Sequence, residues 1–86
     1  MDIIFISNQI KYDILSICGL PAQQSYNLQG TTPLHLIGYG HDDELCRKLE
    51  NKLQLIAEEY NTGRLIANGA VSEDLTVRQC ILMVIV

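Results

Sequence analysis

The strongest constraint on the fold is a helical pattern that runs from Asp42 to about Tyr60. Apolar side chains recur there at steps of three and four residues, at Cys46, Leu49, Leu53, Ile56 and Tyr60. This spacing places them on one face of a helix, while the residues between them are mostly polar or charged. The sequence therefore predicts one long amphipathic helix, which buries its apolar face in a core.

Charged residues at the start of this segment support the same prediction. Asp42, Asp43 and Glu44 suit the positive end of a helix dipole. Arg47 follows Asp43 by four residues, and Lys48 follows Glu44 by four, so the two members of each pair meet on the helix surface. We expect the helix to begin at or next to Asp42.

Short apolar runs elsewhere in the chain predict strands. Residues 3–7 form a run of β-branched and aromatic side chains, which is typical of a strand covered on both faces. Residues 34–39 predict a second strand, because Pro33 stands at its start, where a missing N–H is tolerated. Residues 65–67 predict a short strand, and the β-branched residues of 81–86 predict a terminal one.

The order of these elements predicts the fold class. A first helix is expected after the first strand, capped by Ser7 or Asn8 and ended by the Gly-Leu-Pro at 19–21, and residues 22–32 are expected to be a loop. The segment from Ser72 is either a loop or a capped helical turn. The resulting order, β-α-β-α-β-β, predicts an α/β or α+β sandwich in which helices pack on a small mixed sheet.

Length and charge narrow the classes of protein. Eighty-six residues make a single domain, residues 1–86, whose small core favours a homodimer. Ten acidic residues against six basic ones give a net charge of −4, which argues against a partner such as duplex DNA or an anionic membrane. Three cysteines without a Cys-x-x-Cys pair indicate neither a disulfide framework nor a metal site. We expect a cytoplasmic protein without metal or cofactor.

A candidate site lies where the apolar run at 34–39 meets the long helix. The segment from Ile37 through Gly40 and His41 to Asp42 places an imidazole at a helix N-terminus. Up to four backbone N–H groups lack partners there, and the helix dipole favours an anion. The arrangement predicts a phosphate site with a proton donor beside it.

Three short islands resemble the viral ring nucleases, type III anti-CRISPR proteins that degrade cyclic tetra-adenylate. The first island is the opening run from Met1 to Asn8, similar to the family's first strand and its Thr/Ser-Asn step. The second is the segment from Ile37 to Asp42, similar to the family's Ile-Gly-His-Asp-Ser-Thr. The third is Arg64-Leu65 followed by Val71-Ser72-Glu73. Two departures are Asp43-Glu44 in place of the family's Ser-Thr and Lys11 in place of its Ser.

The resemblance implies a small anti-defence protein that binds a cyclic oligoadenylate and cleaves it without metal. The ribose 2′-hydroxyl would attack the phosphate, and His41 would protonate the leaving oxygen as the catalytic residue. Asn8 would hydrogen-bond a base edge or ribose, Arg64 would grip phosphate, and Lys11 would add a charge beside Gly40 in a ligand-binding set. A C₂ homodimer suits a ligand with twofold pseudosymmetry.

A non-catalytic alternative stays open. In it the chain is a phage-type interaction module that inhibits a larger host protein, docking through the helix at 42–60 or through a strand edge. His41 is then an exposed residue before a helix, Asn8 a helix cap, and Arg64 a solvated charge at a strand edge. The acidic residues at 42–44 favour this alternative, because they repel a phosphate that approaches the same helix end.

Overall fold

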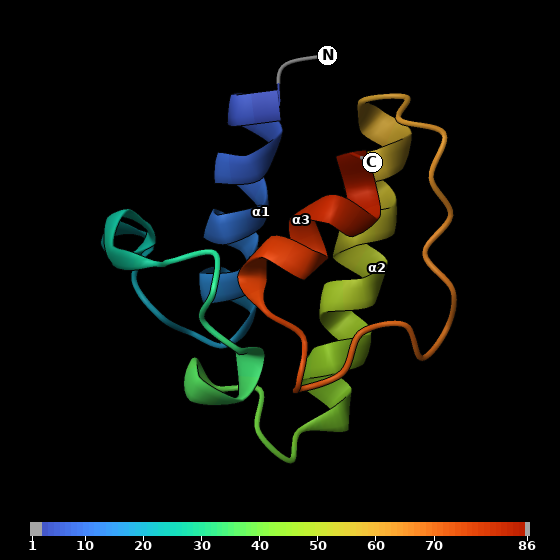
Figure 1. Cartoon of the computed structure of the whole chain (residues 1–86). Coiled ribbons are helices and arrows are strands. Elements are labelled where there is room, and N and C mark those ends of the chain that lie inside the picture. Colours follow the sequence, from blue (N-terminus) through green and yellow to red (C-terminus); the bar gives the residue numbers. More distant parts are fainter. Residues whose placement is uncertain (1–2, 86) are drawn as a thin grey trace.

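The computed structural model describes residues 3–85, and these form a bundle of three helices (Figure 1). Helix α1 spans Ile3–Ile17, α2 spans Asp43–Glu59 and α3 spans Val77–Ile85. Two short 3₁₀ turns, η1 at Ala22–Asn27 and η2 at Leu34–Leu36, lie between α1 and α2. Each long helix packs against the other two, and in Figure 1 α3 crosses between α1 and α2.

The predicted α/β or α+β sandwich is wrong. Residues 3–85 contain no strand, and their β-type pairing is confined to an isolated antiparallel bridge between Pro33 and Thr76. The run at 3–7 is instead the start of α1, because Ile6, Ile10 and Ile14 continue one buried stripe at steps of four. An apolar run of five residues fits a strand or a helix equally well, and its neighbours decide between them.

The other predicted strands are also absent from residues 3–85. In the run at 34–39 the carbonyl of Leu34 accepts from the N–H groups of Ile37, Gly38 and Tyr39, so the chain turns back on itself. Residues 65–67 lie outside any strand. Residues 81–85 belong to α3, and Val86 lies outside the described residues.

Helix α3 begins at a reciprocal cap. The Thr76 hydroxyl accepts from the N–H of Gln79 at 3.2 Å, while the Gln79 side chain accepts from the N–H of Thr76 at 2.9 Å. This is the capping box that a Thr and a Gln three residues apart can form, and it satisfies two N–H groups at the helix start. Residues 81–85 therefore continue the helix instead of pairing as a strand.

The prediction for α2 is confirmed. The helix spans Asp43–Glu59, and the Asp42 carboxylate caps it by accepting from the N–H of Leu45 at 3.1 Å. Asp43 lies 3.8 Å from Arg47, and Lys48 lies 3.5 Å from the carboxylate one turn before it. The predicted face is buried from Cys46 to Ile56, although its last member, Tyr60, is only partly buried.

The core lies where the three helices meet. Its largest fully buried residue is Tyr39, whose hydroxyl donates to the carbonyl of Ile14 at 2.6 Å. Ile10 of α1, Leu49 of α2 and Cys80 of α3 are fully buried around the same centre. Because Tyr39 comes from the turn before α2, it ties this turn to α1.

A long connection between α2 and α3 covers the outer side of α2. Residues 61–76 run along this side in Figure 1, and α2 holds them by side-chain hydrogen bonds. Glu50, only 3% exposed, accepts from the N–H of Val71 at 2.9 Å, and Arg47 donates to the carbonyl of the same residue. Gln54 accepts from the N–H of Ile66 at 2.7 Å. The 61–76 connection is thus anchored at two points along α2.

Candidate functional site

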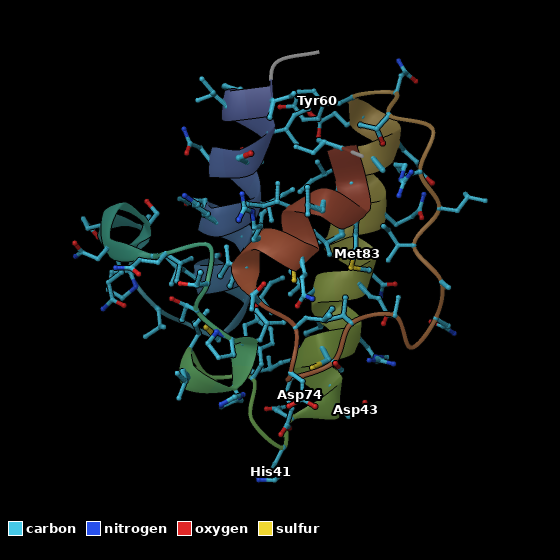
Figure 2. The ribbon with its side chains drawn as sticks, in the orientation of Figure 1. His41, Asp43, Tyr60, Asp74 and Met83 are labelled. Atoms are coloured by element: carbon cyan, nitrogen blue, oxygen red, sulfur yellow. The ribbon has the colours of Figure 1, made fainter. Side chains whose placement is uncertain are left out.

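The structure places Asn8, His41 and Arg64 in three separate hollows. Asn8 and Lys11 lie on α1 and line one hollow, where η1 contributes Ser25. His41 lines a second hollow at the start of α2, and Arg64 lines a third near the end of α2. Figure 2 places His41 at the tip of the loop that enters α2, at the opposite end of this helix from Tyr60.

Carboxylates of the chain itself occupy N–H groups of His41 and of the helix start after it. The His41 backbone is in the left-handed region, with φ +56°, and its N–H donates to the Glu73 carboxylate at 2.6 Å. One turn into the helix, the Asp42 carboxylate takes the N–H of Leu45. Protein carboxylates thus occupy N–H groups to which a phosphate at this helix end would bind.

The charge of this hollow is also unfavourable for an anion. Three carboxylates line it, those of Asp42, Asp43 and Glu73. The cation on the same wall is Arg47, which is engaged by the buried Glu50 at 3.3 Å. The hollow therefore presents net negative charge beside the exposed imidazole of His41.

Cys46 lines the same hollow and is only 4% exposed. Burial raises the pKa of its thiol. The thiolate is the reactive form, so burial lowers the reactivity of this side chain.

Gly40 has a packing role in the turn before His41. A Cβ at this position would lie 3.4 Å from the backbone oxygen of His35, so the two segments approach closely. The N–H of His35 donates to the carbonyl of Glu73 at 3.0 Å. Glu73 therefore binds both sides of the turn, through its carbonyl to His35 and its carboxylate to His41.

Arg64 lies on the exposed 61–76 connection. Its hollow is small, about 240 Å³, and it also contains Gln54, Glu58 and Asn61. The hollow lined by His41 and the one lined by Arg64 have no lining residue in common. The structure thus brings Asn8 to Lys11 and Gly40 to His41, and it keeps these pairs apart from each other and from Arg64.

The most voluminous hollow described, about 600 Å³, lies between α1 and α3. Its walls are formed by Ile3 and Lys11 of α1 and by Arg78, Ile81, Leu82 and Ile85 of α3. Residues 29–31 close one side. We call this surface the α1–α3 groove.

The α1–α3 groove combines exposed apolar side chains with two cations. Ile3 is 56% exposed and Leu82 is 42% exposed. Among residues 3–85, no carboxylate lines the groove, and neither Lys11 nor Arg78 forms an ion pair. Arg78 also lies in the first turn of α3, where the helix dipole disfavours a cation. Local helix energetics therefore do not account for its presence.

Sequence reasoning missed this groove because it assigned residues 3–7 of one wall and residues 81–86 of the other to strands. The helical signal was present in the spacing of Ile81, Leu82 and Ile85 after the Thr-x-x-Gln pattern at 76–79. On α1, Ile3 and Lys11 are separated by two helical turns and share a face with Ser7. Two helices, and no strand, were needed to bring these residues together.

Neither a metal cluster nor a known relative identifies a site. Residues 3–85 contain no group of three His, Cys, Asp or Glu side chains placed to hold a metal ion. None of the helices described has both the length and the apolar character needed to cross a membrane. No family model matches the chain, and comparisons with curated proteins and with solved structures likewise gave no match.

Proposed function

We propose that this chain is a protein-interaction module that recognises a partner protein through the α1–α3 groove. The observation that carries the proposal is the exposure of Ile3 and Leu82 on two adjacent helices beside the cations of Lys11 and Arg78. Burying apolar surface contributes about 25 cal/mol per Å², so a partner that covers both side chains gains binding energy. An exposed apolar patch rimmed by polar groups is typical of an interaction site.

This proposal relocates the docking surface expected from the sequence. A surface on the helix at 42–60 is less suited, because the 61–76 connection is bonded to Arg47, Glu50 and Gln54 of α2. A strand edge does not exist within residues 3–85. The α1–α3 groove has no comparable cover within the described chain.

Cleavage of cyclic tetra-adenylate stays a prediction with less geometric support. A ligand that touched Asn8, His41 and Arg64 would have to reach three separate hollows, one of which carries three carboxylates. Calorimetry with cyclic tetra-adenylate tests it directly. Binding that Arg64→Ala weakens, together with cleavage that His41→Ala slows, would establish the nuclease in place of the interaction module.

A display selection tests the interaction module. A library of natural protein fragments is selected on the parent chain, and the enriched fragments are then measured against Leu82→Glu. We expect binding that Leu82→Glu weakens at least tenfold. Leu65→Ser is the matched control, because Leu65 is 90% exposed and lies outside the groove.

The selection also gives a clear negative result. Fragments that bind the parent and Leu82→Glu equally well would remove the groove from the function. A selection that enriches no fragment would contradict the module itself. Circular dichroism of Leu82→Glu confirms that the variant keeps its helices in either case.

A further inference from the structure

We propose that the occupant of the α1–α3 groove is an amphipathic helix of the partner that carries carboxylates beside its apolar stripe. This inference rests on the proposed function and specifies the partner's chemistry. The apolar stripe would cover Ile3, Ile81 and Leu82, and the carboxylates would face Lys11 and Arg78.

A helix fits the groove better than an extended segment because residues 3–85 contain no strand edge with which an extended peptide could pair. The two walls of the groove are helices, so they present no continuous row of backbone groups at the spacing of a strand edge. In the loop on its closed side, the carbonyl of Gly30 accepts from the N–H of Arg78 at 2.9 Å. An extended peptide would leave its own N–H and C=O groups unpaired against this surface, whereas a helix pairs them internally.

The dimensions match a helix of two to three turns. Ile3 and Lys11 are eight residues apart on α1, which corresponds to about 12 Å along the axis. A partner helix with apolar residues at i, i+3 or i+4, and i+7 covers nearly the same length. One wall can therefore be followed by consecutive turns of a bound helix.

The charge of the groove selects an acidic helix over a basic or neutral one. The chain as a whole carries −4, yet the residues of 3–85 that line the groove include two cations and no carboxylate. Carboxylates placed beside Lys11 and Arg78 would form charge-assisted hydrogen bonds. A lysine-rich helix would meet two like charges and lose affinity.

Two synthetic helical peptides test this inference. Both carry the same leucine stripe, with glutamates beside the stripe in one and lysines in the other. We expect the glutamate peptide to bind the parent chain at least tenfold more tightly than the lysine peptide. The double variant Lys11→Glu with Arg78→Glu should reverse this preference, whereas the control Lys48→Glu with Lys52→Glu, on the exposed surface of α2, should keep it.

Three outcomes would overturn the inference. The first is equal affinity for the two peptides, and the second is a preference that persists in the Lys11→Glu, Arg78→Glu variant. The third is evidence that something else occupies the groove. Such evidence would be a homodimer of this chain that Leu82→Glu dissociates, or binding to phosphatidylglycerol vesicles without binding to either peptide. If fragments selected on the groove bind there but are neither helical nor acidic, this inference fails while the interaction module stands.

Discussion

The two sides of the bundle differ in how far the rest of the chain covers them. On the outer side of α2, the Glu50 carboxylate accepts from the N–H of Val71, and Arg47 donates to the carbonyl of the same residue. The 61–76 connection therefore covers this side of the helix. On the side formed by α1 and α3, Ile3 and Leu82 remain exposed and have no such cover within the described chain.

Residues on the covered side therefore stabilise the fold, whereas exposed residues on the α1–α3 side are available for another function. A buried carboxylate such as Glu50 is costly unless it is paired, so its partners are structural necessities. Exposed leucines and unpaired cations contribute little to folding. The predictions below test this contrast, and they begin where the expected effect on stability is largest.

The largest effect is expected from Glu50→Ala. This change leaves Arg47 without its buried partner and leaves the N–H of Val71 without an acceptor. Because Arg47 is partly exposed, the cost comes mainly from the lost charge-assisted hydrogen bond and the unpaired N–H, about 3 kcal/mol of unfolding free energy. Urea denaturation measures the loss, and Glu59→Ala, an exposed site on the same helix, serves as the control. Equal effects of the two changes would mean that the 61–76 connection is not anchored as described.

The next effect is a loss of stability at alkaline pH. Burial raises the pKa of the Cys80 thiol to about 12, against an ordinary value of 9.0. Above pH 9 this thiol loses its proton in the unfolded chain but keeps it in the folded chain. The contribution of this thiol to stability is therefore fully present below pH 9, and it falls as pH rises toward 12. By pH 10.5 the loss from this thiol is about 2 kcal/mol.

Cys80→Ala isolates the contribution of this thiol. Denaturation of parent and variant at pH 8 and pH 10.5 should show a smaller alkaline decrease in the variant. Burial also raises the pKa values of Tyr39 and Cys46, so part of the decrease remains. An alkaline decrease that is identical in parent and variant would show that Cys80 is not buried in the folded state.

A smaller effect is expected at the start of α3. Thr76→Ala removes the hydroxyl that accepts from the N–H of Gln79, and loss of such a cap costs about 1 kcal/mol. Thr76→Ser keeps a hydroxyl and should retain most of this stability. If the Ala and Ser variants unfold at the same urea concentration, the capping box does not stabilise α3.

The smallest effect is expected from Leu82→Gln in the groove. Because Leu82 is exposed, its loss should change the unfolding free energy by no more than about 0.5 kcal/mol. Val84→Ala on the buried side of α3 is the contrast, with an expected cost of about 2 kcal/mol from lost methyl groups and a cavity. A large cost for Leu82→Gln would place this side chain in the core and leave the groove without its main apolar contact.

The sequence predicted α2 well because several independent signals agree there. The apolar spacing from Cys46 to Ile56, the Asp42 cap and the Asp43–Arg47 pair all act within a few residues of each other. Such local signals are read from the chain without knowledge of the fold. The same reasoning predicted a strand at 3–7 because it took Ser7 or Asn8 as the cap of the first helix. It therefore missed that the buried apolar face of this helix already begins at Ile6.

The candidate site was less predictable because it depends on contacts between distant segments. The signal at His41 was local and is present at the expected helix end, but the carboxylate of Glu73, 32 residues later, reaches its N–H. Nothing near His41 in the sequence indicates this contact. The groove likewise needs α1 and α3 side by side, and its residues are separated by most of the chain.

The docking of α3 onto the segment before η2 has a consequence for the order of folding. The N–H groups of Val77 and Arg78 donate to the carbonyls of Thr32 and Gly30, which lie more than 40 residues earlier. A nine-residue helix has little stability alone, and closing so long a loop is entropically costly. We therefore expect α3 to join a bundle of α1 and α2 that has already collapsed. Hydrogen exchange in which α3 stays protected while α1 and α2 open would contradict this order.

One wall of the groove is then created by the last step of folding. A partner that binds there would bind fully folded molecules in preference to partly folded ones. Its binding would therefore stabilise the folded chain, and more strongly at a higher partner concentration. For a chain this small, a partner bound in the groove would help to hold α3 in place.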